Sequence, residues 1–228
     1  MATLLPLSAI EPALVESLLD AAFGADRAGR TAYRIREGMD WLPGLSFAAL
    51  DEEDYLAGTI QLWPVALTDD GGRTHPLLMV GPVAVMPGRQ GEGFGKALIA
   101  AALGAVDPAA ALPQVLIGDF DYYGRWGFSA AHTGGWQCPG PWDPARLLVR
   151  CDAPATLPRE GILGPWTGAA IVAPRRGALR PPARTRRPEP RRNRRRGGCA
   201  PPAPGRRLDP GGTGRQRDAH RRRRKLVA

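Results

Sequence analysis

The sequence predicts an α+β fold for residues 1–166, followed by a disordered basic tail over residues 167–228. Three observations lead to this prediction. Apolar residues recur at helical intervals near the N-terminus, hairpin strands follow, and an almost wholly apolar strand then runs into a glycine-rich loop and a helix. The charge reverses near the boundary: residues 1–165 hold 11 basic and 19 acidic residues, whereas residues 166–228 hold 20 basic and three acidic ones.

The first predicted elements are two helices and a hairpin. Ser8 and Glu11 have the spacing of a capping box, and the apolar periodicity after them predicts a helix over residues 10–23. A second helical stretch is predicted over 31–37. Strands over 45–50 and 56–67 follow, separated by an acidic turn, and the turn TDDGG at 68–72 closes the hairpin.

Residues 76–85 are almost wholly apolar, as in a strand whose sheet is covered on both faces. We expect this strand to form the core of the fold. Gly81-Pro82 interrupts it, and because proline cannot donate to a strand ladder, the dipeptide predicts a bulge or a local separation of neighbouring strands. A helix over 96–106, a buried strand over 115–118, a short helix over 122–126 and a final strand over 147–150 complete the predicted domain.

The cysteines and the N-terminus indicate the compartment. Cys138, Cys151 and Cys199 are far apart and form no C-x-x-C motif, so we expect reduced thiols, with neither a disulfide framework nor a metal site. The N-terminus has no basic segment and carries Glu11 and Glu16 where a signal peptide is apolar. No apolar run is long enough to span a bilayer, and we expect a soluble, cytoplasmic protein without membrane partners.

Residues 83–96, VAVMPGRQGEGFGK, join the apolar strand to a helix through a loop with four glycines. Such a loop can point successive N–H groups at one anion, and the helix dipole adds to the attraction, so the segment predicts a phosphate site. A Walker loop would need glycine at Gln90 and a hydroxyl at Ala97. A dinucleotide fingerprint would need glycine at Lys96 or Leu98. Both of these nucleotide classes are therefore disfavoured.

The loop instead resembles the acetyl-CoA signature of the GNAT superfamily of N-acetyltransferases, Q/R-x-x-G-x-G/A after a strand that ends V-x-V-x-P. The matching residues are Val83, Val85, Pro87, Gln90, Gly93 and Gly95. A second segment, YGRWGF at 123–128, resembles the Y-x-x-x-G-F element of the same superfamily. Over roughly residues 3–166, including GILGPW at 161–166, the chain is similar to a bacterial subgroup of these proteins. The asparagine and alanine common upstream of the second element are absent, and Gly118-Asp119-Phe120 occupies that region.

The resemblance implies the GNAT fold, a mixed and mostly antiparallel sheet flanked by helices. It also implies acetyl-CoA as cosubstrate and an amine of a small molecule or a protein as acceptor. Strand main-chain groups would bind the pantetheine arm, and loop amides would bind the pyrophosphate. The implied binding residues are Val83, Ala84, Val85, Gln90, Gly91, Glu92, Gly93, Phe94, Gly95 and Lys96. The side chain of Glu92 is expected to face solvent, and Lys96 either reaches a phosphate or is a solvated helix residue.

Acetyl transfer to an amine develops negative charge on the thioester oxygen, and N–H groups freed near Val85 by the bulge would stabilise that charge. The resemblance implies Tyr123 as the acid that protonates the departing thiolate, and a phenol carries the necessary proton at neutral pH because its pKa lies well above that pH. The alternative is an aromatic core cluster of Tyr122, Tyr123, Trp126 and Phe128. No general base is identified: Asp119, Asp121 and His75 have ordinary roles in turns and strand edges, and water could also serve.

The tail leaves other functions open. It is dominated by Arg, Pro, Gly and Ala and has too few apolar residues for a packed core. Arginine runs at 191–196 and 221–225 could bind nucleic-acid phosphates, although no aromatic residues, helix-turn-helix or zinc pattern accompany them. A nucleic-acid-binding protein and a non-catalytic CoA-binding domain are therefore alternatives. One lysine among 20 basic residues also suggests a frameshifted GC-rich reading frame. A monomer and a homodimer are equally compatible with the sequence.

Overall fold

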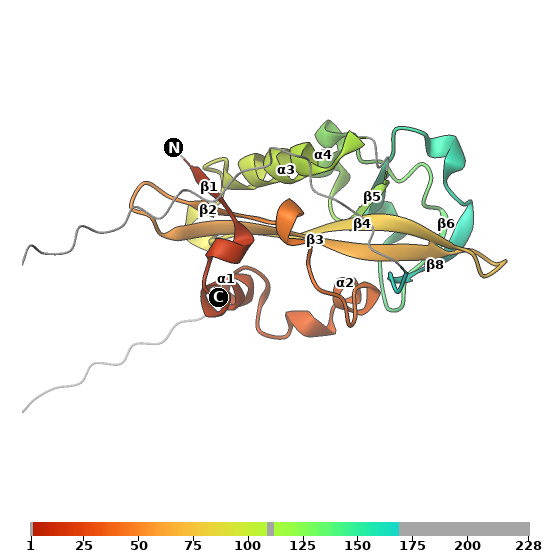
Figure 1. Ribbon diagram of the computed structural model, residues 1–228, viewed down its shortest axis with the longest axis horizontal. Coiled ribbons are helices and arrows are strands. Elements are labelled where there is room, and N and C mark those ends of the chain that lie inside the picture. Colours follow the sequence, from red (N-terminus) through yellow and green to blue (C-terminus); the bar gives the residue numbers. More distant parts are fainter. Residues whose placement is uncertain (1, 109–111, 169–228) are drawn as a thin grey trace, which may run out of the picture. The chain divides into compact units, whose positions relative to one another are not determined.

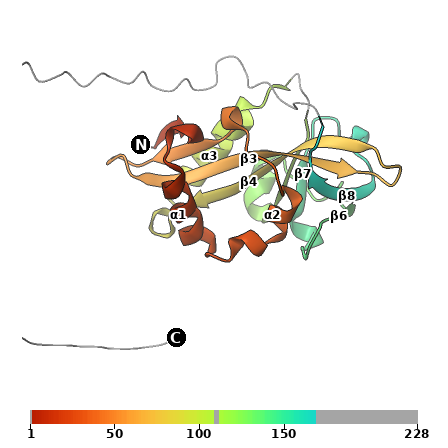
Figure 2. The same cartoon turned by 60° about the horizontal axis from the view of Figure 1, so that its bottom comes forward.

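The computed structural model describes residues 2–108 and 112–168, so the predicted tail from residue 169 lies outside the described residues. A mixed β-sheet separates two helical layers (Figure 1). Helices α3 (Phe94–Ala105) and α4 (Phe120–Tyr123) lie over one face, and α1 (Pro12–Phe23) and α2 (Thr31–Ile35) lie over the other. The turned view shows α1 and α2 side by side across that second face (Figure 2). The predicted α+β class is confirmed.

In the described part of the chain the sheet has eight strands. They are β1 (Thr3–Pro6), β2 (Phe47–Leu50), β3 (Leu56–Thr68), β4 (Thr74–Val85), β5 (Gln114–Ile117), β6 (Gly135–Gln137), β7 (Leu147–Arg150) and β8 (Glu160–Pro165). The main order is β1-β2-β3-β4-β5-β7, while β8 pairs with β3 and β6. Only β4–β5 and β6–β8 are parallel, which confirms a mixed, mostly antiparallel sheet.

The start of α1 differs from the prediction. Glu11 precedes Pro12, and a residue before proline is held in extended backbone, here with φ −59° and ψ 126°. The helix therefore begins at Pro12, which is favoured at the first helical position, and Ser8 lies in a separate 3-10 turn (Leu7–Ala9). The predicted capping box was wrong. α2 ends two residues before the predicted end, at Ile35.

β4 is the central strand, as predicted, and it carries the predicted bulge. It pairs with β3 from end to end, but the register shifts between the pairs Ile60–Val83 and Leu62–Val80. Two residues of β4, 81 and 82, therefore oppose one residue of β3. Gly81 has a φ of +121°, and the peptide bond to Pro82 is cis.

The predicted separation of strands is also present. β5 pairs in parallel with β4 only at Leu78 and Met79, and it pairs with β7 along its whole length. Among the described residues, β4 has no strand neighbour on this side between Met79 and its end at Val85. An edge of main-chain groups is therefore open in the middle of the sheet.

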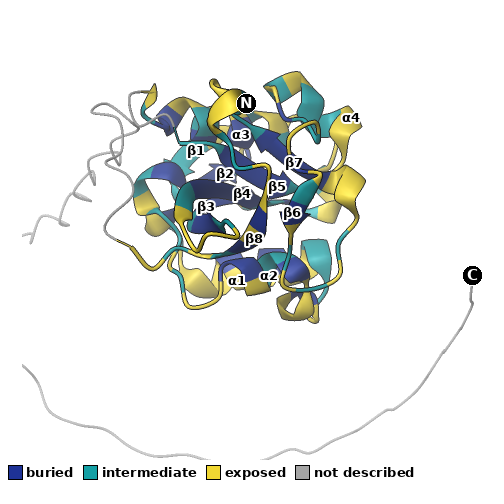
Figure 3. Cartoon of the chain, turned by 90° about the vertical axis from the view of Figure 1, so that its right-hand side faces the viewer, coloured by how far each residue is buried: buried dark blue, intermediate teal, exposed yellow. Residues whose placement is uncertain are grey.

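Apolar clusters cover both faces of the sheet. α3 contributes Leu98, Ile99 and Ala102 to the cluster on its face, and α1 contributes Leu18 and Leu19 to one on the opposite face. In Figure 3 the strands form a mostly buried layer, drawn dark blue, between helices whose outer surfaces are largely exposed. This burial fixes the positions of β4 and α3, and with them the loop that joins the two.

Three strands, β1, β6 and β8, were not predicted. Because β8 follows β7 in the chain, the prediction that residues 147–150 form the final strand was wrong. β1 and β6 are short, and β8 contains Gly161, Gly164 and Pro165, which are residues of low strand propensity. β8 is held instead by its pairing with the far half of β3, from Val65 to Thr68. Long-range pairing of this kind overrides local propensity. α3 also begins two residues before the predicted start.

Candidate functional site

A cleft of about 380 Å³ opens where β4 and β5 separate, beside the first turn of α3. The end of β4, the glycine loop, α3 and α4 all contribute to its lining. The lining residues are Val83, Val85, Arg89, Gln90, Gly91, Gly93, Phe94, Gly95, Lys96, Tyr122 and Tyr123. The structure thus brings together Tyr123 and eight of the ten residues implied in acetyl-CoA binding.

The other two implied residues, Ala84 and Glu92, do not line the cleft. Ala84 points to the opposite face, where its side chain is 1% exposed and packs in the cluster of Leu18. Strand alternation directs Val83 and Val85 toward the α3 side. Ala84 can therefore contribute only main-chain groups. Glu92 is solvent-exposed and forms an ion pair with Arg89.

The glycine loop leaves main-chain donors unobstructed. Gly91 and Gly93 have φ values of +88° and +92°, a region that favours glycine. Gly93 is the N-cap of α3 and no side chain caps this end, so the first N–H groups of the helix lack a side-chain acceptor. A β-carbon at Gly95 would lie 2.9 Å from the hydroxyl of Tyr122, so the absence of a side chain there keeps the cradle open. The residues present fit an anionic diphosphate at the positive end of the helix dipole.

Two cations, Arg89 and Lys96, line this end of the cleft. Sequence reasoning missed Arg89. Its Nε donates to Glu92 Oε1 at 2.9 Å, and its Nη1 donates to Asp51 in the turn between β2 and β3. The hydrogen bond to Glu92, followed by that to Asp51, raises the pKa of Arg89. The guanidinium therefore stays charged and is held in one position beside the loop.

Asp51 connects the turn after β2 to the glycine loop. Its side chain is almost fully buried, and Oδ1 accepts hydrogen bonds from the main-chain N–H groups of Glu53 and Tyr55. Burial alone would raise the pKa of Asp51, but the bonds from Tyr55 and Arg89 outweigh it and hold the pKa below its usual range. Because 38 residues separate Asp51 from Arg89, no local sequence signal marked this contact.

Tyr123 both lines the cleft and packs in an aromatic group, so the two interpretations of this residue are compatible. Its ring meets those of Tyr122 and Phe128 edge-on, at centroid distances of 5.0 and 6.1 Å. Burial, with smaller contributions from Tyr122 and Asp119, raises the pKa of Tyr123 to about 12. The phenol is therefore protonated at neutral pH and can donate to an anion in the cleft.

Tyr122 is a further lining residue that sequence reasoning left in the core cluster. Its hydroxyl lies beside Gly95 at the first turn of α3, and the guanidinium of Arg125 lies 5.4 Å from its ring centroid. Burial raises the pKa of Tyr122. The only sequence signal was the doubled tyrosine, since the resemblance marks the second one alone.

The side chains considered as general bases lie elsewhere. His75 is bonded to Asp69 at 2.8 Å beside the turn between β3 and β4. Asp119 forms an ion pair with Arg146 at 3.1 Å, and Asp121 is exposed. None of these three candidates lines the cleft.

The described residues hold neither a metal-binding cluster nor a membrane-spanning helix. Residues 2–108 and 112–168 contain no group of three or more His, Cys, Asp or Glu side chains that could hold a metal ion. In the same residues, no helix combines the length and the apolar character needed to cross a bilayer.

Comparison with solved structures finds proteins that are similar to this chain. The GNAT family N-acetyltransferase YhbS from Escherichia coli, solved in complex with CoA, has a TM-score of 0.54 and 21% identity over 73% of this chain and 89% of that one. A GNAT family acetyltransferase from Brucella melitensis, solved with acetyl-CoA, has a TM-score of 0.42 and 29% identity over 67% of this chain and 97% of that one.

Sequence comparison adds a family match. Residues 13–110 match the model of the acetyltransferase (GNAT) family, a range that includes β4, the glycine loop and α3. No curated protein sequence matches the chain. The family match over residues 13–110 and the fold shared with the E. coli protein agree with each other: the described part of the chain has the fold of the GNAT acetyltransferases.

Proposed function

We propose that the protein transfers the acetyl group of acetyl-CoA to a primary amine of a small molecule or a protein. The observation that carries this proposal is the cleft at the open edge of β4, where an uncapped helix start, two cations and a partly buried tyrosine lie together. The E. coli protein of the same fold was solved with CoA, which agrees with this proposal.

Each part of the cleft suits one part of the ligand. The unpaired main-chain edge of β4 up to Val85 can bind the amides of the pantetheine arm, and the amides from Gly91 to Lys96 can hold the diphosphate. Bound acetyl-CoA supplies an activated acyl group as a thioester. Arg89 and Lys96 contribute positive charge, and Ala84 contributes only its main chain.

Tyr123 is the proposed acid. As the acceptor nitrogen bonds to the carbonyl carbon, the carbon–sulfur bond breaks and the sulfur takes the electron pair. Because its pKa is raised to about 12, Tyr123 is protonated at neutral pH, and Oη can donate its hydrogen to this thiolate as it forms. The proton that leaves the attacking nitrogen, carried by water, balances the one that the sulfur gains. Main-chain N–H groups at the end of β4 stabilise charge on the carbonyl oxygen.

The compartment and the domain boundary belong to the same proposal. Cys138 and Cys151 are free thiols, which suits the reducing cytoplasm, and we propose that the enzyme acts there. We further propose that residues 1–166 form the catalytic domain, since the cleft residues that the structure describes all belong to them.

Calorimetry with acetyl-CoA, followed by a thiol-release assay over small amines, peptides and aminoglycosides, tests this function. We expect stoichiometric binding and thiol release that depends on an amine. Binding without amine-dependent release from any acceptor would favour a CoA-binding domain without catalysis. Absence of binding would overturn the assignment of the cleft.

A further inference from the structure

Arg36, the residue after α2, is buried on the sheet face opposite the cleft's helix. Only 4% of the residue is exposed, and its guanidinium carbon lies 4.1 Å from the ring centroid of Tyr33 and 4.3 Å from that of Trp63. Nη1 donates to the carbonyl oxygen of Gly81 at 2.9 Å. No carboxylate of the described residues forms an ion pair with Arg36.

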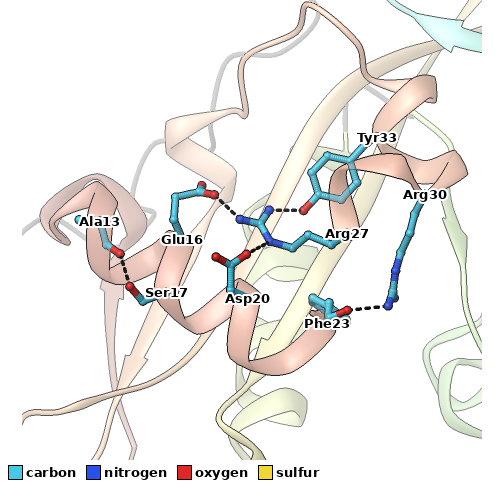
Figure 4. A network of polar contacts seen from close by, with 8 residues as sticks. All are labelled: Ala13, Glu16, Ser17, Asp20, Phe23, Arg27, Arg30 and Tyr33. Carbon is cyan, nitrogen blue, oxygen red and sulfur yellow. Dashed lines mark hydrogen bonds and ion pairs between the residues drawn. The ribbon is translucent and has the colours of Figure 1, made fainter. Parts of the chain in front are cut away.

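The neighbouring carboxylates form ion pairs with Arg27 and not with Arg36. Glu16 and Asp20 on α1 both point to Arg27, whose Nη1 also donates to the hydroxyl of Tyr33 (Figure 4). Both carboxylates are about half exposed, with 60% and 48% of their side chains accessible, so water screens their effect on Arg36. Arg36 thus remains a buried cation without a direct counter-ion. Burial lowers its pKa to about 10.

A second donor at the same place also lacks an acceptor. The indole N–H of Trp63, the ring under the Arg36 guanidinium, is buried and has no hydrogen-bond partner among the described residues. The indole N–H of Trp142, which packs in the same apolar cluster as Trp63, has none either. Buried donors are nearly always paired in folded proteins. This part of the molecule is therefore rich in donors and short of acceptors.

The carbonyl group that accepts from Arg36 lies close to the cleft along the chain. Gly81, which accepts from Arg36, is in the bulge of β4 where that strand leaves β5, two residues before Val83 of the cleft. Aromatic rings lie against the guanidinium, so its N–H groups point outward along its edge, where the Gly81 carbonyl accepts from Nη1. A carboxylate matches this edge because it accepts two parallel hydrogen bonds and retains lone pairs for an indole N–H.

We infer that Arg36 and the indole N–H of Trp63 form a carboxylate subsite for the acceptor, which is therefore an amine that also carries a carboxylate, such as a free amino acid. The inference rests on the proposed acetyltransferase function and names the class of its acceptor. The carboxylate would approach from the side of α2, whereas acetyl-CoA occupies the cleft beside α3.

Matched acceptor pairs test the subsite in the full-length protein. Each pair is an amino acid and its decarboxylated amine: phenylalanine with phenylethylamine, lysine with cadaverine, and histidine with histamine. Thiol release at saturating acetyl-CoA gives kcat/KM for each member. We expect the amino acid of at least one pair to be preferred by about tenfold or more, the factor of a hydrogen-bonded charge pair. Equal values within all pairs, or preference for the amines, would overturn the subsite.

Variants then assign the preference to its residues. Arg36→Gln keeps a donor for the Gly81 carbonyl and removes the charge, so the amino-acid preference should fall about tenfold, whereas Arg36→Lys should retain part of it. Arg34→Gln, at an exposed position in the last turn of α2, is the matched control and should keep the wild-type ratio. An unchanged ratio in Arg36→Gln would overturn the assignment. If Arg36→Gln does not fold, Trp63→Phe provides the second test, because it removes the indole N–H. This variant must lower the ratio of kcat/KM for the amino acid to that for its amine.

The outcomes for the function and for the subsite are distinct. If acetyl-CoA does not bind, or if no acceptor gives thiol release, both the proposed function and the subsite are refuted. Acetylation of both members of each pair at equal efficiency would leave the function standing and refute the subsite alone.

Discussion

Tyr122 and Tyr123 are adjacent on α4, yet they meet the cleft in different ways. Tyr123 is the more deeply buried, and its environment raises the pKa to about 12. Tyr122 is less buried, and its hydroxyl lies beside Gly95 at the helix start. The deeper phenol is therefore suited to hold a proton for a leaving thiolate, and the outer one to contact the diphosphate end of the ligand.

Replacing each tyrosine by phenylalanine should separate these roles. We expect Tyr123→Phe to lower kcat about 100-fold, within the range of roughly 10² to 10⁴ for general acids, while acetyl-CoA still binds. Tyr122→Phe should mainly raise the dissociation constant of acetyl-CoA. Steady-state kinetics and calorimetry of both variants provide the check, and equal losses of kcat in the two would count against Tyr123 as the acid.

The raised pKa of Tyr123 also predicts the pH profile. A phenol acts as an acid only below its pKa, and the shift from the usual 10 to about 12 extends the acid form to higher pH. The rate should therefore rise as the acceptor amine loses its proton, and it should not decline below about pH 10. Initial rates across the neutral and alkaline range measure this. A decline between about pH 7 and pH 9 would show that another group is the acid.

A substitution at Gly93 tests whether acetyl-CoA binding depends on the backbone conformation of the glycine loop. Its φ of +92° is strained for alanine, and it forms the N-cap of α3. Gly93→Ala should weaken acetyl-CoA binding about tenfold or more and lower stability by about 1 kcal/mol. Gly88→Ala is the matched control, because Gly88 has no positive φ and a β-carbon added there would meet no atom within 4 Å. Calorimetry and thermal melting compare the two, and similar effects would mean that the backbone conformation at Gly93 does not matter.

At the scale of elements, the parts that could be predicted are those whose signals are local. β4, the glycine loop and α3 are contiguous, and their apolar run, glycines and helix pattern identified them together with eight of the ten expected binding residues in the cleft. β8 could not be predicted, because its glycines and proline disfavour a strand and pairing with β3, about 100 residues earlier, overrides them. Arg89 and Tyr122 were missed because their contacts with Asp51 and Gly95 join residues that are distant in sequence.

Asp51, in the turn after β2, should influence acetyl-CoA binding because it holds Arg89 beside the glycine loop. Asp51→Asn keeps an oxygen for the N–H groups of Glu53 and Tyr55 and removes the charge that holds Arg89. We expect acetyl-CoA affinity to fall several-fold, with Glu53→Gln on the same turn as the control. Because the pKa of Asp51 is depressed, the ion pair persists above that pKa and is lost only as the pH falls through it. If Asp51→Asn binds acetyl-CoA as tightly as the wild-type protein, Asp51 has no influence on the site.

At the scale of the whole molecule, the last described strand closes the fold. β8 covers the edge of β3 from Val65 to Thr68 and inserts Leu163, which is 1% exposed, into the cluster on the α2 face. The predicted domain boundary at residue 166 keeps this strand, and a boundary before Glu160 removes it.

Truncation tests the boundary. A chain that ends at Gly168 should keep the melting temperature and acetyl-CoA affinity of the full-length protein. A chain that ends at Pro158 should melt at least about 5 °C lower and aggregate, because it exposes an unpaired strand edge and opens a cavity at Leu163. Thermal melting and light scattering distinguish the two chains. Loss of acetyl-CoA affinity in the longer one would assign a role in the site to residues 169–228.

Residues 81–85 of β4 contact both the acetyl-CoA cleft beside α3 and the proposed carboxylate subsite beside α2. The carbonyl of Gly81 is held from the side of α2, and Val83 and Val85 line the cleft beside α3. A shift in this short segment on occupation of one region must be transmitted to the other, so the two substrates should bind cooperatively. By thermodynamic reciprocity, acetyl-CoA must change the affinity for the acceptor by the same factor as the acceptor changes the affinity for acetyl-CoA.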